Sequence, residues 1–78
     1  MTKEEFKENV LDTLWFWGDP DKVDEIRRAV NEVFASKWSN DVRYLNDKVR
    51  GLAWEFCDGP ELASCMKDIM GLVFKLEV

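Results

Sequence analysis

Hydrophobic residues recur every three or four positions along most of the chain, and this spacing predicts helices. The first helix opens with a capping-box pattern, in which the Thr2 hydroxyl and the Glu5 carboxylate can accept from free backbone N–H groups. This helix is expected to run to about Trp17, because Gly18 follows as a helix stop.

Three more helices follow from breaks at residues 18–20, 39–41 and 58–60. Asp19 and Pro20 provide an N-cap and a first-turn proline, which opens a second helix from about Pro20 to Ser36 or Lys37. The apolar positions of the three helices are Val23, Ile26, Val30, Val33, Phe34 and Trp38 in the second, Val42, Leu45, Val49, Leu52 and Phe56 in the third, and Leu62, Met66, Ile69, Val73 and Leu76 in the fourth.

The last residues fit two structures. Leu72, Phe74, Leu76 and Val78 alternate at period two, as in a short strand, but they also continue the fourth helix. A lone strand would need a second chain to pair with, so helix is favoured over residues 72–78. We therefore expect one all-α domain over residues 1–78, a small bundle of three to four helices arranged as two antiparallel helical hairpins, with a short C-terminal strand as the alternative end of the fourth helix.

Composition and charge indicate a folded soluble domain, with 46% hydrophobic and 35% charged residues. The net charge of −5 resides in residues 1–25, where eight acids face three lysines, whereas residues 26–78 hold eight of each sign. No apolar run approaches the length of a membrane span, and the start of the chain lacks the apolar stretch of a signal peptide. A cytoplasmic location without membrane contact is expected.

The residues of enzyme chemistry are missing. The chain has no histidine, so it offers no Ser-His or Cys-His pair and no imidazole metal ligand. Acidic residues at 19–24 superficially suggest a calcium loop, but Val23 and Asp24 stand where a ligand and a glycine are required. We expect no enzymatic activity, no cofactor, and no catalytic or metal-binding residues.

The two cysteines, Cys57 and Cys65, have a spacing that matches no zinc or thioredoxin-type motif. We expect two reduced, half-buried thiols. Because they flank a predicted turn between helices, a disulfide across that turn stays open as an alternative.

Basic residues on the second and third predicted helices resemble a helix-turn-helix in their placement. Asp41, Asp47 and Glu55 are interleaved with them and would place negative charge against phosphate. Direct binding of nucleic acid is therefore disfavoured.

The aromatic residues exceed what the predicted core needs. On a helical wheel, Phe6, Val10, Leu14 and Trp17 lie within an arc of about 80°, the natural core face of the first helix. Trp15 and Phe16 lie about 180° and 280° from Phe6, on either side of an acidic ridge that contains Glu8 and Asp12. Either Trp15 packs mostly inside the bundle, or Trp15 or Phe16 is exposed until a partner covers it.

The third helix repeats this situation at Trp54, which lies outside the core arc near Arg50, with Tyr44 and Gly51 on the same outer side. A glycine in mid-helix is destabilising and suggests that another backbone approaches there. Trp54 either stacks with Arg50 as a surface contact or belongs to an interface. Trp17 and Trp38, by contrast, fit core faces.

These patterns favour a small acidic protein-binding protein, an inhibitor, regulator or adaptor of the size encoded by bacteriophages and mobile elements. The predicted partner-binding residues are Glu8, Asp12, Trp15, Phe16, Tyr44, Arg50 and Trp54. One alternative is an inhibitor that mimics nucleic acid, because Glu4, Glu8 and Asp12 repeat about every 6 Å along a helix. A second alternative is a purely structural homodimer, and a homodimer is also compatible with target binding.

Overall fold

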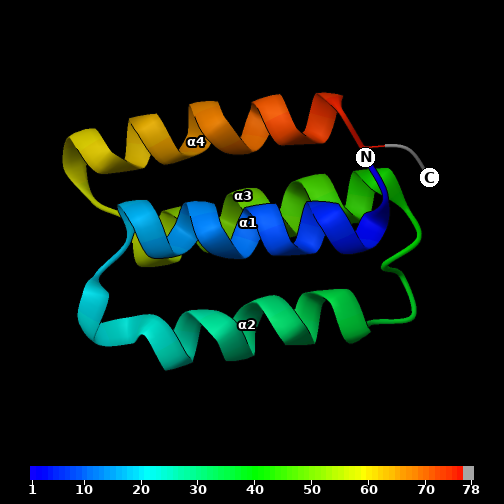
Figure 1. Cartoon of the computed structure of the whole chain (residues 1–78), viewed down its shortest axis with the longest axis horizontal. Coiled ribbons are helices and arrows are strands. Elements are labelled where there is room, and N and C mark those ends of the chain that lie inside the picture. Colours follow the sequence, from blue (N-terminus) through cyan, green and yellow to red (C-terminus); the bar gives the residue numbers. More distant parts are fainter. Residues whose placement is uncertain (77–78) are drawn as a thin grey trace.

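The computed structural model describes residues 1–76, which form four α-helices and no strand. The helices are α1 (Lys3–Trp17), α2 (Val23–Ala35), α3 (Val42–Phe56) and α4 (Gly59–Phe74), and a 3-10 turn at Pro20–Lys22 leads into α2. Successive helices run in opposite directions (Figure 1). The expected small all-α bundle of two antiparallel hairpins is confirmed.

The helices occupy the corners of a bundle whose extents are 31 × 22 × 17 Å. α1 packs mainly against α2 and α4, and α3 packs against the same two helices. In Figure 1, α1 lies between α4 and α2, with α3 behind it. α1 and α3 are therefore diagonal to each other.

Caps explain where the helices begin. The predicted capping box is present: the Glu5 N–H donates to the Thr2 hydroxyl (3.2 Å), and the Thr2 N–H donates to the Glu5 carboxylate (3.0 Å). At the start of α3, the Asp41 carboxylate accepts from the Arg43 N–H at 2.9 Å. Side chains thus replace the partners that the first turn of a helix lacks.

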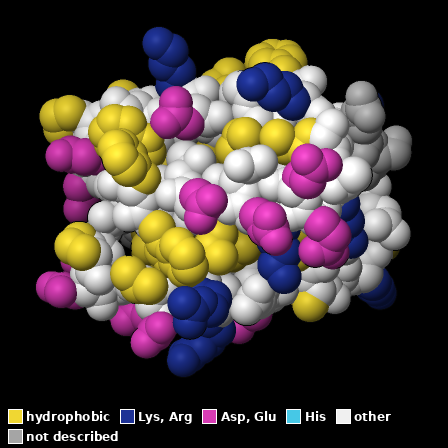
Figure 2. Space-filling model, viewed as in Figure 1, with side chains coloured by type: hydrophobic (Ala, Val, Ile, Leu, Met, Phe, Trp, Pro, Cys, Tyr) yellow, Lys and Arg dark blue, Asp and Glu magenta, His cyan; other side chains and the backbone are white. Residues whose placement is uncertain are grey.

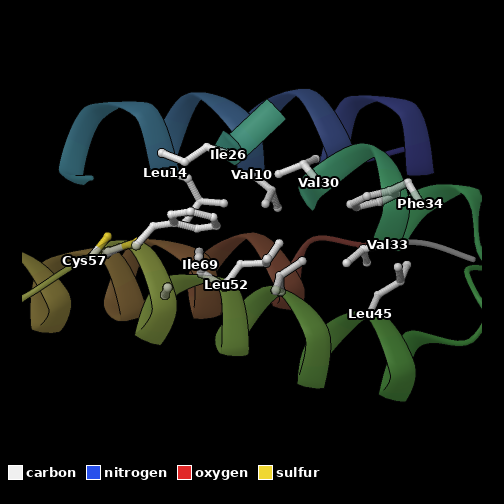
Figure 3. Close-up of a cluster of buried hydrophobic side chains, with 14 of the residues drawn as sticks. Val10, Leu14, Ile26, Val30, Val33, Phe34, Leu45, Leu52, Cys57 and Ile69 are labelled. Atoms are coloured by element: carbon white, nitrogen blue, oxygen red, sulfur yellow. The ribbon is translucent and has the colours of Figure 1, made fainter. Parts of the chain in front are cut away.

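The core takes side chains from all four helices, which point to a shared interior in Figure 3. It contains aliphatic residues, the two cysteines and three phenylalanines, of which Phe6 and Phe34 lie 5.9 Å apart between ring centroids. None of the four tryptophans is fully buried. Among residues 1–76, no helix is both long and apolar enough to cross a membrane.

The expected core position of Trp38 is wrong. α2 ends at Ala35 because Ser36 takes an extended conformation (φ −64°, ψ 147°), so Trp38 lies in the following turn. Its side chain is 58% exposed, and the Lys37 ammonium lies 5.1 Å from the ring centroid. The helical pattern had been extended past the point where the helix stops.

Glycines also differ from expectation. A Cβ at Gly51 would meet no atom within 4 Å, so no backbone from residues 1–76 approaches it. Close approach occurs instead at Gly18, where a Cβ would lie 2.5 Å from the Leu14 carbonyl oxygen. At the other end of the chain, the helix favoured over residues 72–78 holds only through Phe74. Lys75 and Leu76 lie outside α4, and Val78 lies outside the described residues.

Candidate functional site

The outer face of α1 carries Glu8, Asp12 and Phe16, which are spaced by four residues and are all exposed. No ion pair reaches Glu8 or Asp12 from any residue between 1 and 76. Figure 2 views the molecule from this side, with acidic side chains along the line of α1 and hydrophobic side chains gathered on both sides of it. We call Glu8, Asp12 and Phe16 the α1 face.

Phe16 is 76% exposed, and its ring contacts one other aromatic ring. It packs edge-on against Trp17, with 4.7 Å between ring centroids and 83° between ring planes. The Trp17 indole N–H donates a 2.8 Å hydrogen bond to the Oδ2 of Asp68 on α4. A chain of contacts thus links the exposed Phe16 ring, through Trp17, to Asp68 on α4.

Trp15 differs from Phe16, because it is half-buried and joins α1 to the start of α2. Its indole N–H donates to the Val23 carbonyl at 3.2 Å, and the Arg27 guanidinium lies 5.3 Å from its ring centroid. Arg27 also pairs with Asp24 at 3.5 Å. The Trp15 side chain therefore serves the fold, with only part of its surface accessible to a partner.

On α3, Trp54 is 66% exposed and Arg50 is exposed. No cation lies over the Trp54 ring within residues 1–76, so the alternative in which Arg50 stacks on it is not realised. Tyr44 is half-buried, with Lys48 at 5.7 Å from its ring centroid, and it lies about 15 Å from Trp54 along the helix. Tyr44 and Trp54 are thus distinct contact points.

The seven predicted partner-binding residues do not form one surface. Because α1 and α3 are diagonal, Glu8, Asp12 and Phe16 face one side of the bundle, whereas Arg50 and Trp54 face another.

Several surface residues were not predicted from the sequence. Trp17 and Asp68 are 51 residues apart, so no local pattern indicated their hydrogen bond. Phe74 (85% exposed) and Met70 (46% exposed) lie on α4 away from the buried Cys65 and Ile69, a placement that a helical wheel of α4 would have given. α4 therefore adds a second exposed apolar face.

Cys57 and Cys65 are buried in the core, not half-buried as expected. Burial raises the pKa of Cys65 to about 12 and also raises the pKa of Cys57, so both thiols stay protonated and weakly nucleophilic. The depressions of the surface are shallow and open, and a prominent one follows the charged outer side of α2. Within residues 1–76, no three acidic or cysteine side chains converge as a metal site.

Comparisons of the chain with protein-family models, with curated proteins and with solved structures found no match.

Proposed function

We propose that this chain is a protein-binding protein that docks the α1 face onto a target protein. The observation that carries the proposal is Phe16, a large apolar side chain that is exposed and held edge-on by Trp17. Phe16 contributes little to the fold, because most of its surface stays in water. An exposed aromatic beside charged groups is typical of an interaction site.

The energetics fit this role. Burial of an exposed phenylalanine at an interface contributes about 1.5–3 kcal/mol. The helix already fixes the backbone, and Trp17 restricts the ring, so little ordering is needed upon binding. Glu8 and Asp12 would steer a basic target toward the face.

The test is capture of targets from a lysate of the cells that encode the chain, with wild type compared to Phe16→Ala. Phe74→Ala is the matched control, because it removes an equally exposed phenylalanine from α4. We expect Phe16→Ala to lose a protein that wild type and Phe74→Ala both retain. Equal recovery of every protein by all three would contradict the proposal.

The double variant Glu8→Gln and Asp12→Asn should also change the binding kinetics of a target that docks on the α1 face. These substitutions keep size and remove charge, so the association rate should fall while the dissociation rate changes less.

An inhibitor or regulator of this kind fits the small proteins of bacteriophages and mobile elements, and two reduced thiols fit a cytoplasmic location.

Nucleic-acid mimicry is a second candidate. Its support is the exposure of all eight acidic residues in the N-terminal third of the chain, Glu4, Glu5, Glu8, Asp12, Asp19, Asp21, Asp24 and Glu25. A mimic would occupy a basic groove, and its binding should weaken steeply as salt rises. Docking through Phe16 should depend only modestly on salt.

A structural homodimer is a third candidate, supported by Trp54 on α3 and by Met70 and Phe74 on α4. Exposed apolar side chains of this size favour association. Sedimentation velocity over a wide range of concentration tests it, with Trp54→Ser and Phe74→Ser as variants. A sedimentation coefficient that stays that of a monomer throughout would exclude the dimer.

A further inference from the structure

Three aromatic rings at the surface each carry a cation supplied by the chain itself. These pairs are Arg27 on Trp15, Lys37 on Trp38 and Lys48 on Tyr44, at 5.3, 5.1 and 5.7 Å from the ring centroids. Cations at such distances are attracted to the negative face of the ring. In these three pairs the chain itself covers the ring with positive charge.

The pair formed by Phe16 and Trp17, here called the aromatic platform, carries no such cation within residues 1–76. Two carboxylates lie beside it, those of Asp68 and Asp12. Asp68 accepts from Trp17 through Oδ2, and its Oδ1 has no hydrogen-bond partner in the same range. Asp12 lies one helical turn before Phe16.

Trp54 provides the contrast. It also lacks a cation over its ring, but the residue one turn before it is Arg50, which would repel a positively charged partner group. At the aromatic platform the residue one turn before Phe16 is Asp12. The rings and the carboxylates there therefore both attract a positively charged group.

We propose that the aromatic platform, together with Asp68, binds an arginine side chain of the target protein. A guanidinium is planar, so it can stack on an aromatic ring and pair with a carboxylate at the same time, whereas an ammonium is a point charge. The hydrogen bond from Trp17 holds the Asp68 carboxylate in place for such a pair. The inference rests on the proposed function and specifies the target as a basic segment with an arginine anchor.

The experiment follows the four indole N–H signals of ¹⁵N-labelled protein by NMR, assigned with single Trp→Phe variants. The probes are two blocked hexapeptides, one of alternating glycine and arginine and one of alternating glycine and lysine. We expect the arginine peptide to shift the Trp17 signal saturably and about threefold to tenfold more tightly than the lysine peptide, with the Trp54 signal unmoved.

Asp68→Asn keeps an oxygen that can accept from Trp17 and removes the charge, so it should weaken binding by about threefold to tenfold. Asp47→Asn, an exposed carboxylate on α3, is the matched control and should leave affinity unchanged. The inference is overturned if the Trp17 signal does not move, if the lysine peptide binds as tightly, or if the two asparagine variants weaken binding equally.

The two proposals can fail separately. If target capture depends on Phe16 while the arginine peptide leaves the Trp17 signal unmoved, the proposed function stands and the arginine anchor is wrong. If the arginine peptide binds the aromatic platform but Phe16→Ala captures the same proteins as wild type, the platform binds arginine and the proposed docking of a target protein is wrong.

Discussion

Each tryptophan in this chain has its own environment. Trp15 bonds to the Val23 carbonyl, and Trp17 bonds to Asp68 on α4. Trp38 and Trp54 make no indole hydrogen bond within residues 1–76 and are mostly exposed. Two of these side chains thus tie elements together, and the other two leave large apolar surfaces in water.

Gly18 is where a single methyl group should matter most. A Cβ there would lie 2.5 Å from the Leu14 carbonyl oxygen and 3.3 Å from that of Phe56. Backbone atoms cannot move aside cheaply, so Gly18→Ala should lower the free energy of unfolding by about 1–3 kcal/mol, measured by urea denaturation.

Gly51→Ala is the matched control for Gly18→Ala. Its Cβ would meet nothing within 4 Å in the middle of α3, so it should stabilise the protein by roughly 0.5–1 kcal/mol through helix propensity. If both alanine variants changed stability in the same direction, the close contact at Gly18 would not be the cause.

The buried thiol of Cys65 predicts loss of stability at alkaline pH. Burial raises its pKa to about 12 in the folded protein, whereas a free cysteine has a pKa of about 8.5. The unfolded state then releases a proton that the folded state keeps, so stability is full below about pH 8.5 and falls as pH rises toward 12.

Cys65→Ala removes this group and should flatten the alkaline part of the curve of unfolding free energy against pH, whatever its stability at neutral pH. Thermal melts at closely spaced pH values measure the slope. An unchanged slope in Cys65→Ala would assign the alkaline effect to other groups.

Residue positions were predictable from the sequence only where a local pattern decides them. Trp15, Phe16 and Trp54 lie off the core arcs of their helices, but the wheel left open which of them are exposed. Phe16 and Trp54 are exposed, whereas Trp15 is half-buried. Trp17 could not be understood in this way, because its partner Asp68 belongs to a helix that only the tertiary packing brings near. Trp38 was misplaced because the wheel assumed helix beyond Ala35.

At the level of elements, α1 begins with the most complete cap. The Thr2 N–H donates a hydrogen bond to the Glu5 carboxylate, and this bond is the largest cause of the lowered pKa of Glu5. A hydrogen bond with the Thr2 hydroxyl is the second cause. The folded state thus favours the carboxylate, so the contribution of Glu5 to stability is present above its ordinary pKa of about 4.3 and is lost as pH falls through the lowered value.

Glu5→Gln tests this contribution. Glutamine can accept from the Thr2 N–H at every pH, so the variant should lose less stability than wild type upon acidification, as measured by thermal melts. Glu8→Gln, which changes an exposed carboxylate on the same helix, is the control and should follow wild type more closely. If Glu8→Gln lost less stability upon acidification than Glu5→Gln, the cap would not be the acid-sensitive element.

Helix bounds were largely predictable, because stop residues and apolar spacing agree in this chain. α1 and α3 begin and end close to the predicted residues, and α4 begins close to its predicted start, since Gly18, Asp41 and Pro60 leave little choice. α4 ends at Phe74, before the end of the helix favoured over residues 72–78. α2 was less certain at both ends, where the first residues form a 3-10 turn and Ser36 breaks the helix without a glycine or proline. Short polar stops of this kind depend on tertiary packing.

At the level of the whole molecule, charge is uneven. All eight acidic residues of the first 25 are exposed, and those on α1 repeat at the i, i+4 spacing where like charges repel. Salt should screen this repulsion, so moving from low to moderate sodium chloride should raise Tm by a few degrees.

The variant with Glu4→Gln, Glu8→Gln and Asp12→Asn should melt higher than wild type at low salt and respond less to added salt. Differential scanning calorimetry measures both effects. If Tm of wild type did not change with salt, the acidic surface would not be under electrostatic strain.

The diagonal placement of α1 and α3 has a consequence for assembly. Phe16 and Trp54 belong to helices at opposite corners of a bundle that measures 22 Å and 17 Å across its shorter extents. If a target protein covers Phe16 as proposed, we expect Trp54 to stay accessible to a second protein, which would give a ternary complex. In such a complex the chain would hold two proteins on opposite sides of a narrow bundle. Each of these proteins would then have a raised local concentration near the other.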